Sequence, residues 1–209
     1  MNSDATMRPD AQENRETGKG RKSPPSAVLS FAAPIGAGKT TVSTSVAKSL
    51  DAPRISFGEY LRNVAREMGM ELTREALQNL GDQLVTRNVR GFCEAVLAQQ
   101  PWEAGKPLII DGVRHVEILD TLGEIFSPAR EYLIYINLDR TTQAKRFKNN
   151  PLPHEKTLDQ LEEHPTELQV RSRLADRAVL VLDGTKDPNE LARIVIEFLA
   201  SKESAKHRV

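Results

Sequence analysis

The sequence predicts an α/β fold with a five-stranded parallel sheet that helices cover on both faces. Short apolar segments alternate with longer amphipathic segments over residues 27–203, which is the pattern of repeated strand–helix–strand units. A glycine-rich turn follows the first apolar segment directly and leads into a helical pattern. The chain has 209 residues, a length that suits one domain with short extensions.

The predicted strands are short apolar segments bounded by polar residues, glycine or proline. They cover residues 27–33, 54–57, 108–110, 132–138 and 178–182. Helices are predicted between them, where apolar residues recur at intervals of three or four. These cover residues 39–50, 60–68, 73–98 and 139–148, and a last helix follows Asp187 and Pro188.

Both ends of the chain are predicted to lie outside the domain. Residues 1–26 are polar and mixed in charge and have almost no branched aliphatic side chain, so burial would not offset the entropy lost on ordering. We therefore expect a disordered tail there. Residues 204–209 are predicted to form a second, shorter tail.

Composition excludes several classes of protein. Lysine plus arginine and aspartate plus glutamate both number 29, and a net charge of zero argues against a basic nucleic-acid-binding protein. The single cysteine, Cys93, excludes an internal disulfide and fits a reducing compartment. No apolar segment approaches the roughly 18 residues of a membrane helix, and the N-terminus lacks an apolar signal core. We therefore expect a cytoplasmic protein that does not bind membranes.

The strongest chemical signal is the loop APIGAGKTT at residues 33–41, between the first strand and the first helix. Gly36 and Gly38 permit backbone turns that are closed to other residues. The N–H groups around Ala37 and the N-terminus of the following helix can then bind phosphate. The first glycine of the P-loop pattern is here Ala33, which we expect to be tolerated because that position mainly needs a small residue.

The polar residues that follow the loop complete a nucleotide site. Lys39 is expected to reach the β- and γ-phosphates of ATP, and Thr40 is expected to place its hydroxyl on Mg²⁺. Thr41 is the next residue of the phosphate-binding segment. The loop thus predicts binding of ATP and Mg²⁺, but it does not by itself specify a reaction.

Two further segments follow the second and third strands, ISFGEYLR at 55–62 and DGVR at 111–114. Because the carboxyl ends of parallel strands meet in one crevice, both segments are expected to face the P-loop. Asp111 ends an apolar strand, where its carboxylate can hold Mg²⁺. Arg62 and Arg114 carry planar guanidinium groups that suit a second phosphate.

Together these motifs resemble the nucleoside monophosphate kinase superfamily of P-loop proteins, which includes adenylate kinases and dephospho-CoA kinases. ISFGEYLR is similar to the I-S-T-G-D-M-L-R segment of adenylate kinases, with Phe57 in place of threonine and Glu59 in place of aspartate. DGVR is similar to their D-G-F-P-R segment without the proline. Residues 175–185 resemble the segment that lies near the adenine in dephospho-CoA kinase-like proteins.

The resemblance implies a P-loop NTPase fold and a division of roles within the site. The acceptor-binding helices would span about residues 57–100. Arg62, Glu59 and Arg114 would bind the acceptor, and Asp111 would organise Mg²⁺.

A short helical lid is expected over about residues 149–166. In this superfamily the corresponding region closes over the phosphates and supplies arginines, because phosphoryl transfer needs charge neutralisation and exclusion of water. Arg146 is the first candidate for a catalytic lid arginine, followed by Arg171 and Arg173.

The predicted activity is an ATP-dependent phosphotransferase that moves the γ-phosphoryl group to a small phosphorylated metabolite, and we expect a nucleoside monophosphate. One alternative is transfer to a ribose hydroxyl, as in dephospho-CoA kinases. Their Asp-x-Asp pair is replaced here by Ile55-Ser56-Phe57, which favours a phosphate acceptor, although Glu59 could act as a base. A second alternative is a nucleotide-gated ATPase or regulatory module without an acceptor. The sequence leaves the oligomeric state open.

Overall fold

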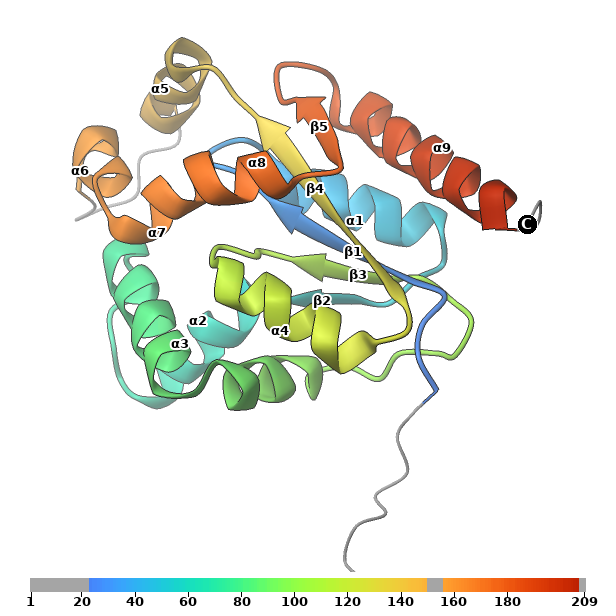
Figure 1. Ribbon diagram of the computed structural model, residues 1–209. Helices are drawn as coiled ribbons and strands as arrows, with labels where there is room; N and C mark the ends of the chain where they lie inside the picture. The colour runs from blue at the N-terminus through green and yellow to red at the C-terminus, as the bar shows by residue number, and fades with distance from the viewer. Residues whose placement is uncertain (1–22, 150–155, 207–209) are drawn as a thin grey trace, which may run out of the picture.

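Five strands form the central sheet of the computed structural model, which describes residues 23–149 and 156–206 (Figure 1). They are β1 (Ala27–Ala32), β2 (Arg54–Ser56), β3 (Leu108–Asp111), β4 (Arg130–Asn137) and β5 (Leu180–Asp183). Their order is β2–β3–β1–β4–β5, and every pair of neighbours is parallel. The predicted five-stranded parallel sheet is confirmed.

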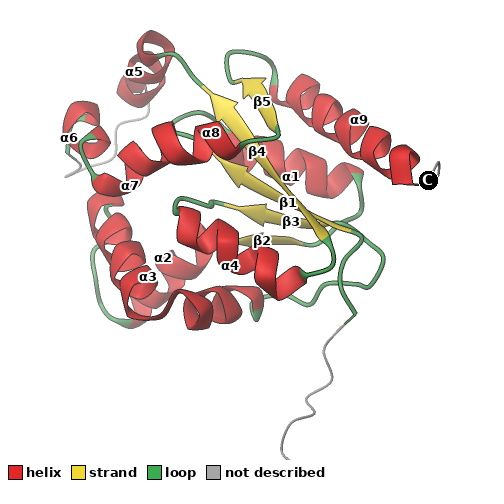
Figure 2. Ribbon diagram, in the orientation of Figure 1, coloured by secondary structure: helices red, strands yellow, loops and turns green. Residues whose placement is uncertain are grey.

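Helices cover both faces of this sheet (Figure 2). On one face lie α1 (Lys39–Ser49) and α9 (Pro188–Lys206). On the other lie α2 (Phe57–Glu67), α3 (Arg74–Leu97) and α4 (Val116–Phe126), together with a π-helical turn, η1 (Val170–Leu174), and α8 (Ala175–Arg177). The remaining helices, α5 (Arg140–Asn149), α6 (Leu158–Glu162) and α7 (Pro165–Gln169), come after the carboxyl end of β4.

The residues of β1 alternate between the two hydrophobic cores that this layering creates. Val28 and Ala32 pack under α3 and α4, whereas Leu29 and Phe31 pack under α1 and α9. All four side chains are completely buried. A central parallel strand needs apolar residues at consecutive positions for this reason, and β1 has them.

The structure corrects two of the predicted elements. Helix α2 begins at Phe57, which was predicted to end the strand, because the Ser56 side chain caps the helix and accepts a hydrogen bond from the Glu59 N–H group at 3.2 Å. Helix α3 contains a break at Asn88, whose φ is −167°. The Asn88 side chain accepts a hydrogen bond from the Gly91 N–H group at 2.9 Å and so starts the second half of the helix.

The predicted tails fall mostly outside the described residues, which exclude 1–22 and 207–209. Within the described part, the chain already pairs before β1, since the Ser26 N–H group donates to the Lys106 carbonyl at 3.0 Å. Helix α9 continues to Lys206. Over residues 23–149 and 156–206, no helix has both the length and the apolar character needed to cross a membrane.

Glu131, near the amino end of β4, is expected to make stability depend on pH. Ser30 donates a hydrogen bond to its carboxylate at 2.5 Å, but burial dominates and raises the pKa of Glu131 from 4.5 to about 7. Between about pH 4.5 and 7, the Glu131 carboxyl is therefore protonated in the folded state but ionised in the unfolded chain. This stabilisation is fully present below about pH 4.5 and is lost as the pH rises through about 7.

Glu131→Gln should accordingly flatten the fall in melting temperature that the wild type shows between about pH 5 and 7. Thermal unfolding followed by circular dichroism at several pH values measures this slope. Glu197→Gln, on the exposed face of α9, is the matched control and should keep the wild-type slope. An unchanged slope in Glu131→Gln would contradict the assignment.

Candidate active site

The loop between β1 and α1 has a backbone conformation that depends on its glycines. Gly36 and Gly38 have φ values of 78° and 81°, a region that other L residues rarely adopt. Gly38 is the N-cap of α1 and provides no side-chain cap. The loop therefore presents the N-terminus of α1 to a neighbouring cavity, and an anion placed there would meet N–H groups and the positive end of the helix dipole.

Two alanines of the loop serve its packing. Ala33, which replaces the first glycine of the motif, is buried in the core under α1 and α9. The Ala37 N–H group donates to the Pro34 carbonyl at 3.3 Å and so closes a turn within the loop. All the residues predicted to bind the nucleotide line the cavity: Gly36, Ala37, Gly38, Lys39, Thr40 and Thr41.

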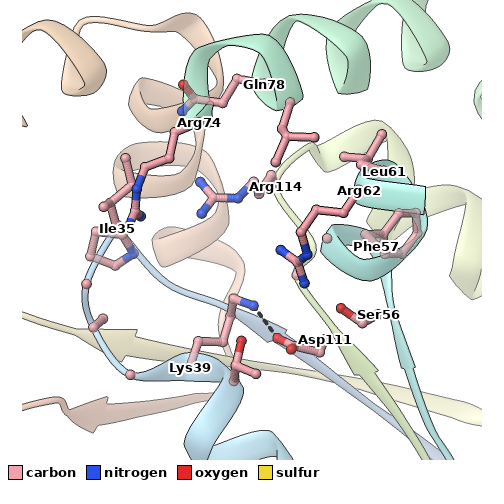
Figure 3. Close-up of a pocket in the computed structure, with 18 of the residues that line it drawn as sticks. Ile35, Lys39, Ser56, Phe57, Leu61, Arg62, Arg74, Gln78, Asp111 and Arg114 are labelled. Carbon is pink, nitrogen blue, oxygen red and sulfur yellow. Dashed lines mark hydrogen bonds and ion pairs between the residues drawn. The ribbon is translucent and has the colours of Figure 1, made fainter. Parts of the chain in front are cut away.

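The polar centre of the site is an ion-paired triad of Asp111 at the carboxyl end of β3, Arg54 at the start of β2 and Lys39 at the start of α1. Asp111 is 1% exposed, and its two carboxylate oxygens bind Lys39 and Arg54. Figure 3 shows the contact between Lys39 and Asp111 below the cavity. Arg54 also donates to Glu59 at 2.9 Å and to the Ser43 hydroxyl at 3.2 Å, so it joins β2 to α1 and α2.

These contacts set the charges of the triad. Burial lowers the pKa of Lys39, and the negative charge of Asp111 opposes this lowering only in part. Burial alone would raise the pKa of Asp111, but Lys39 and Arg54 outweigh it and lower that pKa. Asp111 is therefore an anion held by two cations and is a poor proton acceptor.

A cavity of about 580 Å³ extends from the P-loop to α2 and α3. Cationic and amide side chains from three other elements line it: Arg62 from α2, Arg74 and Gln78 from α3, and Arg114 from the loop after β3. In Figure 3 the three arginines extend from different sides toward the space above Lys39. The cavity is thus lined by the P-loop on one side and by further cations on the other.

The three residues predicted to bind the acceptor have different contacts, and only two of them line the cavity. The Arg62 guanidinium lies over Gly58, since a Cβ on that glycine would come within 3.5 Å of it. Arg114 lines the cavity but also pairs with Glu167, which is completely buried on α7. Glu59 is bound by Arg54 and is not among the residues that line the cavity.

Helix α5 carries Arg146 to the P-loop. Its guanidinium donates to the Gly36 carbonyl at 3.4 Å and to the Gly184 carbonyl at 2.9 Å. Arg146 therefore joins the P-loop to the segment at 183–185 that was predicted to lie near the adenine. It is not among the residues that line the cavity.

The other two predicted lid arginines also lie outside the cavity lining. Arg171 binds Glu162 and donates to Gln143 at 2.5 Å, and Arg173 is 60% exposed with Glu117 at 3.9 Å. Part of the predicted lid, residues 150–155, lies outside the described residues, and α6 and α7 follow it.

Two charged residues at the site, Arg54 and Arg74, were not predicted from the sequence. Alternation along β2 places Arg54 and Ser56 on the same side, and Ser56 is in register with Asp111 on the neighbouring β3. That pairing could be used only once the strand order was known. Arg74 carried a local signal, because it is the first residue of α3, where the helix dipole disfavours a cation.

Comparisons with known proteins agree with this architecture. The family model described as AAA domain matches residues 33–164. None of the curated proteins matches the chain. Among solved structures, a gluconokinase from Sinorhizobium meliloti is 17% identical with a TM-score of 0.55, over 87% of this chain and 96% of that one.

Two shikimate kinases are similar in fold to about the same degree. The enzyme from Acinetobacter baumannii, solved in complex with shikimate, is 18% identical with a TM-score of 0.54 and covers 87% of this chain and 96% of its own. The enzyme from Aquifex aeolicus is 15% identical with a TM-score of 0.53, over 84% and 98%. These similarities confirm the predicted P-loop kinase fold.

Proposed function

The chain belongs to the AAA domain family, and from that premise we propose that it is an ATP-dependent kinase acting on a small phosphorylated metabolite. One observation carries the proposal. The P-loop with its Lys39–Asp111 pair opens into the same cavity as Arg62 and Arg114, which come from the opposite wall. A donor phosphate chain and an acceptor phosphate would each meet cations in this space.

On the donor side, the residues match the needs of phosphoryl transfer. Lys39 would neutralise charge on the β- and γ-phosphates of ATP, where negative charge builds on the bridging oxygen as its bond to the γ-phosphorus breaks. Thr40 and Asp111 offer a hydroxyl and a carboxylate oxygen, the ligand types that Mg²⁺ prefers, and both line the cavity. A bound Mg²⁺ would supply further positive charge and orient the phosphates.

On the acceptor side, a phosphate suits the cavity better than a hydroxyl. A hydroxyl acceptor needs a base, whereas a phosphate is already ionised. Asp111 is the one carboxylate lining the cavity in the parts of the chain that the structure describes, and two cations hold it ionised. We place the nucleoside part of a nucleoside monophosphate against apolar residues of the same wall, namely Leu61, Leu72 and Leu77.

The direct test is ADP release from ATP with a panel of possible acceptors. Nucleoside monophosphates should stimulate release, and the matching nucleosides without phosphate should not. Equal release with and without acceptors would favour the nucleotide-gated ATPase. Stimulation by dephospho-CoA, gluconate or shikimate, but not by nucleoside monophosphates, would favour a hydroxyl acceptor.

Arg114→Lys should raise the acceptor KM about tenfold or more and leave the ATP KM almost unchanged. Lysine keeps the charge but loses the planar fork that binds two phosphate oxygens. Steady-state kinetics with each substrate varied in turn measure both constants, and a melting curve checks the pairing with Glu167.

Arg193→Lys, at an exposed position on α9, is the control and should change neither constant. An increase in the ATP KM would assign Arg114 to the donor side. If neither constant moves, Arg114 serves only as the partner of Glu167.

A further inference from the structure

Glu167 binds two residues of the acceptor side of the cavity from outside the cavity. Its side chain is completely buried on α7 and is not among the residues that line the cavity. One carboxylate oxygen, Oε1, accepts hydrogen bonds from Arg114 and, at 3.1 Å, from the Gln78 amide group on α3. Both of these partners line the cavity. A buried carboxylate thus supports two polar side chains of the acceptor wall.

Stability alone does not account for the ion pair between Glu167 and Arg114. Removing a carboxylate from water is unfavourable, and a buried ion pair is often no more stabilising than apolar residues of the same volume. The second carboxylate oxygen, Oε2, is buried and has no hydrogen-bond partner among residues 23–149 and 156–206, which adds to the cost. Because such a local conflict is expected mainly at functional sites, it directs attention to what the carboxylate does to Arg114.

The short helix that carries Glu167 is bound to its neighbours on both sides of this residue. The Thr166 hydroxyl donates to Asp82 on α3 at 2.7 Å. The Gln169 amide oxygen accepts a hydrogen bond at 2.6 Å from the Val116 N–H group, at the start of α4. The carboxylate therefore has a set position relative to α3 and to the loop between β3 and α4, which a positioning group needs.

Arg114 needs an anion on this side because a second cation lies close to its loop. A Cβ on Gly112 would come within 3.5 Å of the Lys39 ammonium group. Burial is the main cause of the lowered pKa of Lys39, but the positive charge of Arg114 adds to it, so the two cations repel each other. In Figure 3 the Arg114 guanidinium lies above Lys39 in the cavity. Its pairing with Glu167 opposes this repulsion before any phosphate is bound.

We propose that Glu167 is a positioning residue that holds the Arg114 guanidinium in the orientation that binds the acceptor phosphate. The pair uses the Nη1 atom of Arg114, and the guanidinium has further N–H donors on Nε and Nη2 for two phosphate oxygens. Glu167 itself would contact no substrate. The proposal rests on the proposed function, because it requires an acceptor that carries a phosphate.

Calorimetry tests this role on Glu167→Gln, a variant of nearly the same size that loses the charge. The Kd is measured for a nucleoside monophosphate, for the matching nucleoside without phosphate and for ATP, and a melting curve verifies folding. Glu163→Gln is the matched control, because Glu163 is exposed at the end of α6 and loses the same charge. Glu167→Asp keeps the charge but withdraws the carboxylate by one methylene. It should show the same pattern at smaller size, and it serves as the test if Glu167→Gln does not fold.

Glu167→Gln should raise the Kd of the nucleoside monophosphate about tenfold, the size expected when a charged hydrogen bond is weakened. The Kd values of the nucleoside and of ATP should change by less than about threefold, and Glu163→Gln should match the wild type. In an Arg114→Lys background, which already lacks the planar fork, adding Glu167→Gln should change the Kd of the nucleoside monophosphate by less than about twofold.

A merely structural role would give a different pattern, because a distorted wall would weaken the nucleoside and its monophosphate alike. Equal weakening of these two ligands would therefore overturn the proposal. The same tenfold effect in the Arg114→Lys background would also overturn it, as would an unchanged affinity of Glu167→Gln for the nucleoside monophosphate.

These measurements do not depend on phosphoryl transfer. If the wild type binds nucleoside monophosphates but they do not stimulate ADP release, the kinase assignment fails, and the Kd values still decide the role of Glu167. If they stimulate release by the wild type and Glu167→Gln binds them equally well, the kinase assignment stands and the role of Glu167 is wrong. A wild type that binds no nucleoside monophosphate would overturn both.

Discussion

Lys39→Ala is expected to lower kcat by about 100-fold or more, the effect of removing one preorganised charge from a phosphoryl-transfer site. Lys39 is nearly buried and is held by Asp111, so its ammonium group is positioned before any nucleotide binds. Alanine removes this charge without adding bulk to the cavity. The fold should survive because Arg54 still compensates Asp111.

Steady-state ADP release at saturating ATP measures this effect, and a melting curve verifies folding. Lys48→Ala, on the exposed last turn of the same helix, is the control and should leave kcat unchanged. Near-normal turnover in Lys39→Ala would refute the assignment of the P-loop as the catalytic centre.

Arg54→Met is expected to reduce the free energy of unfolding by about 3 kcal/mol at pH 7, the lower end for breaking a buried ion pair. The Asp111 carboxylate is 1% exposed and would keep only Lys39 as a partner. Arg54 also joins β2 to Ser43 and Glu59, so methionine removes several contacts at once while filling a similar volume. Urea unfolding followed by circular dichroism measures the difference.

The pH dependence of this difference gives a second check. The cations lower the pKa of Asp111 below 3.8 in the folded state, so their stabilisation is present above about pH 4 and is lost as the pH falls through the lowered value. The difference in the free energy of unfolding between Arg54→Met and the wild type should therefore become smaller below about pH 4. Arg193→Met, which removes an exposed pair with Glu197, should leave the unfolding midpoint unchanged. If Arg54→Met has the same urea midpoint as the wild type, Lys39 alone is enough to compensate the charge of Asp111.

Most of the sheet was predictable because its strands are apolar and bounded by polar residues. The phosphate loop could be located because its chemistry depends on consecutive residues, and Gly36 and Gly38 indeed take conformations that favour glycine. Helix α4 was not predicted, although Ile118, Leu119 and Leu122 are buried at helical spacing. No helix is predicted between the third and fourth strands, so this apolar face has no place in the predicted fold.

The partners of the site residues could not be predicted, because they depend on how distant segments pack. Arg54 meets Asp111 only because β2 and β3 are neighbours in the sheet. Arg114 meets Glu167 across 53 positions of sequence. The direction of α5 takes Arg146 to the carbonyls of Gly36 and Gly184, a placement that no local pattern indicates.

The fate of the γ-phosphoryl group tests the central claim most directly. The protein would be mixed with ATP labelled in that group and with a nucleoside monophosphate acceptor, and the labelled products would be separated after a single turnover. The two-sided cavity predicts that the label appears in a phosphorylated acceptor, and that Lys39→Ala abolishes this product. Label found only in inorganic phosphate, at a rate that no acceptor changes, would contradict the assignment of a kinase.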